Sequence, residues 1–144
     1  MKGFRCMNVR RQAMAIWLRK ASNDWLNVQN NLVSDRIPWD TVCFHAQQTI
    51  EKLLKALLVC RGIVPHRSHD LLLLFDASPL DARVLRRWRA YCRELNNFAL
   101  LGRYEGEDPR PAKARSIVRN AGRLREAILE RIESKSAAEK EQAK

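Results

Sequence analysis

One segment of the chain carries several side chains that can contact phosphate. His45, Gln48, Lys52 and Lys55 are spaced by three, four and three residues, so they share one side of a predicted helix. An imidazole, an amide and two ammonium groups can all bind a phosphoryl group or a ribose hydroxyl. Glu51 stands four residues before Lys55, the favourable order for a helical ion pair. The alternative interpretation is an ordinary solvated face, and the spacing alone leaves both open.

Two further places could complete such a site. His69 opens a short predicted helix, where it either pins the loop or faces Arg103 and Lys52 across a groove and contacts a phosphate. Arg103 and Tyr104 lie in a loop rich in glycine and proline, a common position for ligand contacts. In the alternative, Tyr104 packs on the end of the bundle while Arg103 pairs with Glu51 or Asp70.

The elements that must position these residues are helices. Apolar residues recur at helical spacing and no segment alternates as a strand does. We expect an all-α, up-and-down bundle of four long helices plus one short helix. The expected helices span about residues 11–31, 39–61, 69–75, 81–98 and 111–133. Residues 14–133 would form the domain, after a basic and poorly ordered segment 1–13 and before a disordered tail 134–144.

The net charge points to an anionic partner. The 144 residues include 27 basic and 16 acidic ones, which gives a net charge of +11. Such a surplus attracts nucleic acid, nucleotides or an acidic protein. The densest basic surface is expected on the fourth helix, from Arg83, Arg86, Arg87, Arg89 and Arg93. Among the four tryptophans, Trp39 at a helix start is the one expected to contact a ligand, while the others follow core spacing.

Composition argues against several other classes of protein. The four cysteines are far apart and form no CxxC pair, so we expect reduced thiols in the cytoplasm and neither a disulfide framework nor a zinc site. No metal and no cofactor are predicted. The run Leu71–Phe75 is five residues long, too short to cross a bilayer, and no membrane partner is expected.

The segment from Cys43 to Leu58, CFHAQQTIEKLLKALL, resembles the signature helix of the HEPN family. The similarity continues through Gly62, Pro65 and the RSHDL segment of residues 67–71, and it covers roughly residues 14–130. Upstream, Trp17, Ala21 and Asp24 match the family's opening helix; downstream, Arg103 and Tyr104 stand where the family usually has Arg-Tyr-Pro-Asp.

This resemblance implies a nucleotide-binding helical bundle, often a homodimer. Family members are commonly encoded beside an MNT-type nucleotidyltransferase, as toxin–antitoxin or related pairs. Many are metal-independent ribonucleases with an Arg-x(4–6)-His motif. Here no histidine follows Arg103, and the matching pair Arg61 and His66 lies in the loop after the signature helix. The weak catalytic candidates are therefore His69, Arg103, Arg61 and His66.

Three functions remain in view. The first is a nucleotide- or RNA-binding HEPN domain that works with a nucleotidyltransferase partner. The second is an active metal-independent ribonuclease. The third is a purely structural module whose basic face meets an acidic protein. The predicted phosphate contacts are His45, Gln48, Lys52, Lys55, His69, Arg103 and Tyr104.

Overall fold

The computed structural model describes residues 2–99 and 108–142, and in these residues every regular element is a helix. Their order is α1 (Lys2–Leu32), α2 (Trp39–Cys60), α3 (Leu71–Ala77), α4 (Ala82–Leu95), the short 3-10 helix η1 (Asn96–Phe98) and α5 (Pro111–Gln142). The predicted all-α class is confirmed. The predicted start of the second helix near residue 39 is confirmed as well, and that helix ends at Cys60.

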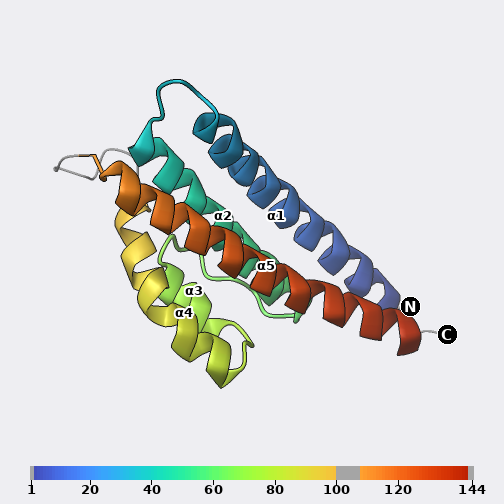
Figure 1. Ribbon diagram of the computed structural model, residues 1–144. Helices are drawn as coiled ribbons and strands as arrows, with labels where there is room; N and C mark the ends of the chain where they lie inside the picture. Colours follow the sequence, from blue (N-terminus) through green and yellow to red (C-terminus); the bar gives the residue numbers. More distant parts are fainter. Residues whose placement is uncertain (1, 100–107, 143–144) are drawn as a thin grey trace.

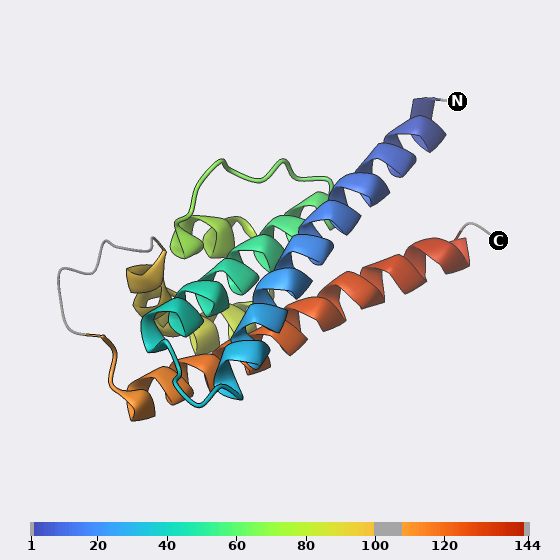
Figure 2. The ribbon, with the colours of Figure 1, turned by 90° about the horizontal axis from the view of Figure 1, so that it is seen from above.

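Helix α2 lies at the centre of the molecule. It packs against α1, against α5, and against the α3–η1 region. Figure 1 shows α1 and α5 as long rods beside α2, with α3 and α4 forming a shorter pair. In the view from above, the ends of α1 and α5 that carry the termini extend beyond the rest of the bundle (Figure 2).

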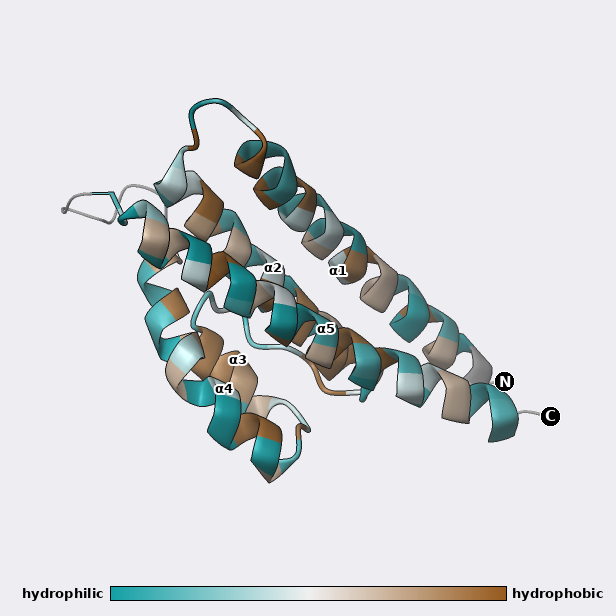
Figure 3. Cartoon of the chain, in the orientation of Figure 1, coloured by the Kyte–Doolittle hydropathy of each residue, from teal (hydrophilic) through white to brown (hydrophobic). Residues whose placement is uncertain are grey.

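The apolar faces predicted from periodicity form the core. All seven core positions expected on α2 are buried: Cys43, Ala46, Ile50, Leu53, Leu54, Leu57 and Leu58. The same is true on α5, where the buried positions are Ala114, Ile117, Val118, Ala121, Leu124, Ile128 and Ile132. Figure 3 shows the matching pattern, with hydrophilic segments along the outer sides of the helices. The 3.6-residue helical period therefore predicted correctly which residues of α2 and α5 face the core.

Local signals set the boundaries near α2 and α3. Gly62 follows α2 with φ of +76°, a left-handed conformation that glycine adopts without steric cost. Asp70 caps α3, because its carboxylate accepts a hydrogen bond of 2.9 Å from the Leu72 amide. Asp81 caps α4 in the same way, at 3.0 Å from the Val84 amide.

Both ends of the chain differ from the expectation. Helix α1 begins at Lys2 and α5 continues to Gln142, whereas we expected helix only from about residue 11 and up to about residue 133, with poorly ordered segments outside. Within the C-terminal stretch, Lys135 and Glu139, four residues apart, form an ion pair of 3.8 Å. Neither stretch contains a proline that would end the helix, and the C-terminal stretch is rich in alanine, lysine and glutamate, which favour helix even without a core to bury.

The cysteines are unpaired. Cys43, Cys60 and Cys92 are buried and Cys6 is exposed, all as free thiols. Burial raises the pKa of the Cys43 and Cys92 thiols to about 12, so both stay protonated and unreactive near neutral pH. Among the described residues no cluster of three histidine, cysteine or acidic side chains could hold a metal ion. None of the described helices combines the length and apolarity that crossing a membrane requires.

The central position of α2 makes its core residues decisive for stability. Leu54 is fully buried, whereas Leu26 on α1 is 51% exposed. We expect Leu54→Ala to lower the free energy of unfolding by about 2–5 kcal/mol, since it removes buried methyl groups and leaves a cavity. Leu26→Ala, the matched control, should change it by less than about 0.5 kcal/mol. Urea unfolding followed by circular dichroism measures both, and equal effects would show that α2 is not the centre of the core.

Candidate functional site

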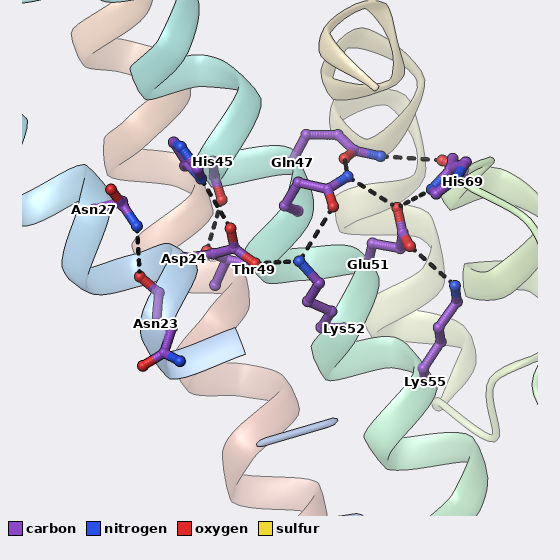
Figure 4. A network of polar contacts seen from close by, with 11 residues as sticks. Asn23, Asp24, Asn27, His45, Gln47, Thr49, Glu51, Lys52, Lys55 and His69 are labelled. Carbon is purple, nitrogen blue, oxygen red and sulfur yellow. Dashed lines mark hydrogen bonds and ion pairs between the residues drawn. The ribbon is translucent and has the colours of Figure 1, made fainter. Parts of the chain in front are cut away.

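The polar residues predicted on one side of α2 meet residues from α1 and from the loop before α3. We call this cluster the α2 network; it comprises Asp24, His45, Gln47, Gln48, Glu51, Lys52, Lys55 and His69 (Figure 4). The structure brings together every predicted phosphate contact that lies among the described residues. The network is not a simple solvated face, because Gln47, Glu51 and Lys55 are buried.

The first half of the network is built on Asp24 of α1. This carboxylate is 8% exposed and lies 2.8 Å from Nδ1 of His45. Its second oxygen accepts a hydrogen bond from the ammonium group of Lys52. Asp24 therefore sets the orientation of the His45 ring and neutralises the charge of Lys52.

The second half is built on Glu51 of α2, which is 2% exposed. One carboxylate oxygen accepts a hydrogen bond of 2.9 Å from Lys55, and the other lies 3.0 Å from Nδ1 of His69. The Glu51–Lys55 pair predicted from the sequence is confirmed. The Lys55 ammonium also lies 5.0 Å from the centre of the Trp17 ring, which adds a cation–π contact on its other side.

Two glutamines join the halves. The Gln48 side-chain oxygen accepts a hydrogen bond of 3.2 Å from Lys52, while its nitrogen donates to Glu51 at 3.1 Å and to Gln47 at 2.8 Å. Gln47 in turn donates to the backbone carbonyl of His69 at 3.0 Å. The chain of contacts therefore runs without a break from His45 to His69.

The loop that carries His69 is held on its other side as well. The Asp70 carboxylate accepts a hydrogen bond of 2.8 Å from Asn96, and the Asn96 side-chain oxygen accepts one of 2.7 Å from the Leu71 amide. The Asn96 hydrogen bond is the main cause that lowers the pKa of Asp70, with further help from the backbone amide of Leu72. His69 thus has a fixed backbone although its side chain is 62% exposed.

The charges of the network balance. With both imidazoles neutral, the carboxylates of Asp24 and Glu51 offset the ammonium groups of Lys52 and Lys55. Removing such groups from water costs several kcal/mol per ion unless each finds a partner. The pairing satisfies that requirement. The lysines consequently add no surplus positive charge to this face, in contrast to the cationic face expected from the sequence.

Sequence reasoning did not identify three members of the network as site residues: Asp24, Gln47 and Glu51, of which Glu51 was expected only as the ion-pair partner of Lys55. Asp24 had a visible signal, because it stands three residues after Ala21 and four before Val28, both on the core-facing stripe of α1. An acid at such a position needs a buried partner. Gln47 is fully buried, and no pattern in the sequence distinguished it from Gln48.

The remaining candidates lie elsewhere. Arg61 follows α2 as its C-terminal cap, and its buried Nε has no hydrogen-bond partner among the described residues. His66 is exposed in the loop. Among the described residues, no hydrogen bond or ion pair joins Arg61 to His66. Trp39 lies under the guanidinium of Arg115, 4.8 Å from the ring centre. Arg103 and Tyr104 lie outside the described residues.

Comparison with known proteins identifies one family. The model of the HEPN domain matches residues 14–132, which include α2, the whole α2 network and most of α5. Searches of curated proteins and of solved structures give no significant match.

The buried pairing makes a sharp stability prediction. Glu51→Met should lower the free energy of unfolding by about 3–5 kcal/mol, since it leaves the Lys55 charge buried without a counterion. The double variant Glu51→Met/Lys55→Met should recover most of that loss, because it removes both charges at similar volume. A double-mutant cycle in urea measures the coupling.

The matched control is the exposed pair Arg89–Asp76, at 2.9 Å with side chains 43% and 48% exposed. Asp76→Asn should change stability by less than about 1 kcal/mol. If Glu51→Met cost no more than this control, the Glu51–Lys55 pair would not be the buried charge pair described above.

Proposed function

The chain belongs to the HEPN family, and on that premise we propose that it binds phosphoryl groups of a nucleotide or an RNA along the α2 network. Membership of the family supports binding of a nucleotide or an RNA in general. One observation supports the α2 network as the place where it binds. His45 and His69 are each held through Nδ1 by a buried carboxylate, at 2.8 and 3.0 Å. Histidines oriented in this way are typical of rings that contact a ligand through the other nitrogen.

The chemistry follows from the ring nitrogens. A carboxylate at Nδ1 favours the tautomer in which Nδ1 carries the proton, so the neutral ring offers Nε2 as an acceptor to a ribose hydroxyl. When the ring is protonated, Nε2 donates instead and can bind a phosphate oxygen. Each imidazole therefore contacts either part of a ribonucleotide without moving from its carboxylate.

The arrangement favours an extended ligand. The two histidines lie at opposite ends of the network, with Lys52 between them (Figure 4). Gln48 bridges Lys52 and Glu51 by hydrogen bonds. An RNA segment or a nucleoside polyphosphate fits this spread better than a single phosphate ion. Lys52 is 17% exposed and can join the contacts, whereas Lys55, 8% exposed, acts by positioning Glu51. Arg103 and Tyr104 remain predicted contacts.

We expect His45→Ala and His69→Ala each to weaken binding of a short single-stranded RNA or of a nucleoside triphosphate by about tenfold, the value of one charge-assisted hydrogen bond. Fluorescence anisotropy with a labelled ligand measures the affinity, and ligand-induced shifts of the unfolding temperature give a second readout. His66→Ala is the control, because His66 is exposed and has no contact with the network.

Unchanged affinity in both network variants, with the fold intact, would place any phosphate site elsewhere. Equal losses in His66→Ala would show a general effect of removing histidines.

A second candidate function is metal-independent ribonuclease activity, favoured by the same carboxylate–histidine pairs. A histidine oriented by a carboxylate is the arrangement of a general base. Nε2 of His69 or His45 would accept the proton of a ribose 2′-hydroxyl as that oxygen attacks the adjacent phosphorus. The 5′-oxygen then leaves with a proton, which yields a cyclic phosphate and a 5′-hydroxyl.

Cleavage of a labelled RNA in EDTA tests this candidate. If the chain is a ribonuclease, the wild type and His66→Ala should both cleave, and His69→Ala or His45→Ala should lower the rate at least about 100-fold. Cleavage that persists in both network variants would point to Arg61 and His66 or to Arg103. No cleavage by the wild type would leave binding as the function of the network.

The partner proposals rest on the family resemblance alone. They are pairing with an MNT-type nucleotidyltransferase in a toxin–antitoxin-like system, a homodimer and a cytoplasmic location. The basic surfaces of the molecule are compatible with an acidic partner protein too, which is the third function considered from the sequence.

A further inference from the structure

The first half of α5 carries positive charge, with no acidic residue between Asp108 and Glu126. Residues 109–125 contain six basic side chains and no acidic one. By comparison, the five arginines of α4 share that helix with Glu94 and with the capping Asp81. The second half of α5 contains five glutamates between residues 126 and 142. Residues 109–125 therefore hold a positive surplus, as the opening residues 1–23 do with six basic side chains and no acidic one.

Three of these arginines form a line that we call the α5 ridge: Arg115, Arg119 and Arg123. They are spaced by four residues, so each follows the last by about 6 Å along the helix and about 40° around it. All three are exposed. No helix covers the outer side of α5 in either view (Figures 1 and 2).

The ridge is not occupied by internal contacts. Within the described residues, Arg119 and Arg123 have neither an ion-pair nor a hydrogen-bond partner, and Arg115 contacts only the Trp39 ring. Other basic residues of α5 do have partners, since Lys113 pairs with Glu94 and Arg131 with Asp81. The three guanidinium groups of the ridge are thus available to a ligand.

These charges do not serve the stability of the helix. Positive side chains near a helix N-terminus oppose the helix dipole, and α5 has no acidic residue in its first turn to offset them. α4 differs, because Asp81 at its cap supplies a favourable negative charge. The ridge itself begins at Arg115, beyond the first turn, where the dipole has little effect, so its arginines gain nothing from the helix and are better explained by an external anion.

The shape and chemistry of the ridge select the kind of anion. Guanidinium groups at regular intervals along a straight helix match a linear polyanion, and arginine binds phosphate with two parallel hydrogen bonds. Trp39 is partly buried beneath the Arg115 guanidinium, so it offers a flat aromatic surface at the start of the ridge once that guanidinium turns to a phosphate. A base can stack on such a surface only when it is free, as in a single strand, because the bases of a duplex are already stacked.

We propose that the α5 ridge, together with Trp39, binds a single strand of nucleic acid, with the arginines on successive phosphates and one base on the tryptophan. RNA and DNA share this backbone chemistry, and the experiment below separates them. The ridge is built from residues outside the α2 network, so the proposal does not require that network to bind anything.

The test compares two variants of equal charge. The ridge variant is Arg115→Gln/Arg119→Gln/Arg123→Gln, and its control is Arg83→Gln/Arg86→Gln/Arg93→Gln on α4, which also removes three exposed arginines without described partners. The probe is a labelled single-stranded RNA of about 12 nucleotides, within the usual range of site sizes. Single-stranded DNA, duplex RNA and polyglutamate of matched length form the other arms.

The ridge variant should bind the RNA strand roughly 10- to 100-fold more weakly, and the slope of log affinity against log salt should fall by about two, which is 0.7 for each of three phosphates. The α4 control should lose less than about threefold. Weaker binding of DNA than RNA would assign a contact to the 2′-hydroxyl. Unfolding temperatures establish that both variants remain folded.

Trp39 has its own readout. A strand of the same length with abasic sites should bind the wild type more weakly than the intact strand, by about 5- to 100-fold for one lost stacking contact. Trp39→Leu should remove this difference between the two strands, even if it also lowers stability, because the comparison is made within one variant.

Several results would overturn the proposal. Equal losses in the ridge variant and the α4 control would show a diffuse basic surface. Polyglutamate binding that is as strong as RNA binding and equally dependent on the ridge would make the ridge a docking site for an acidic protein. Tighter binding of duplex RNA than of single-stranded RNA would exclude the stacking role of Trp39. In contrast, loss of nucleoside triphosphate binding in His45→Ala or His69→Ala, with the ridge variant unaffected, would support the proposal that the ridge acts separately from the α2 network.

Discussion

The enclosure of α2 is the constraint on which the rest of the structure depends. α1, α5 and the α3–η1 region surround this helix, so most of its side chains are removed from water. A charge in such a place needs a partner, since burial of an unpaired ion costs far more than a hydrogen bond returns. Asp24 from α1 and Glu51 within α2 meet that requirement for Lys52 and Lys55. The network is therefore part of the stability of the bundle before it is part of any function.

The same constraint orients the two histidines. Each acid that neutralises a lysine also holds an imidazole through Nδ1, so the geometry of His45 and His69 follows from the pairing of the charges. The residues that we propose as ligand contacts are therefore also residues that hold the fold together. A substitution in the network can therefore change both the stability of the fold and the binding of a ligand. The effect of substituting the buried Lys55 is followed by unfolding, and the effect of substituting the exposed His69 is followed by ligand affinity.

The distribution of charge has a second consequence. Because the acids of α1 and α2 neutralise the lysines of the network, the net charge of +11 must come from other surfaces. Lys113 and Arg131 pair with acids near α4, and the glutamates of α5 lie in its second half. The basic residues that remain unbalanced lie on the first half of α5 and also on α1 and α4. The structure thus separates a neutral polar network beside α2 from a positive ridge on α5.

The sequence by itself determined the helices, the core faces of α2 and α5, the Glu51–Lys55 pair and the family resemblance, because each depends on residues within a few positions of one another. Helical periodicity and capping are local properties. Only the tertiary structure decided that Asp24 reaches Lys52 and His45, that His69 meets Glu51, and that the predicted positive face is electrically balanced. These contacts join residues 18 to 28 positions apart, and no local pattern encodes how α1 and the loop before α3 pack around α2.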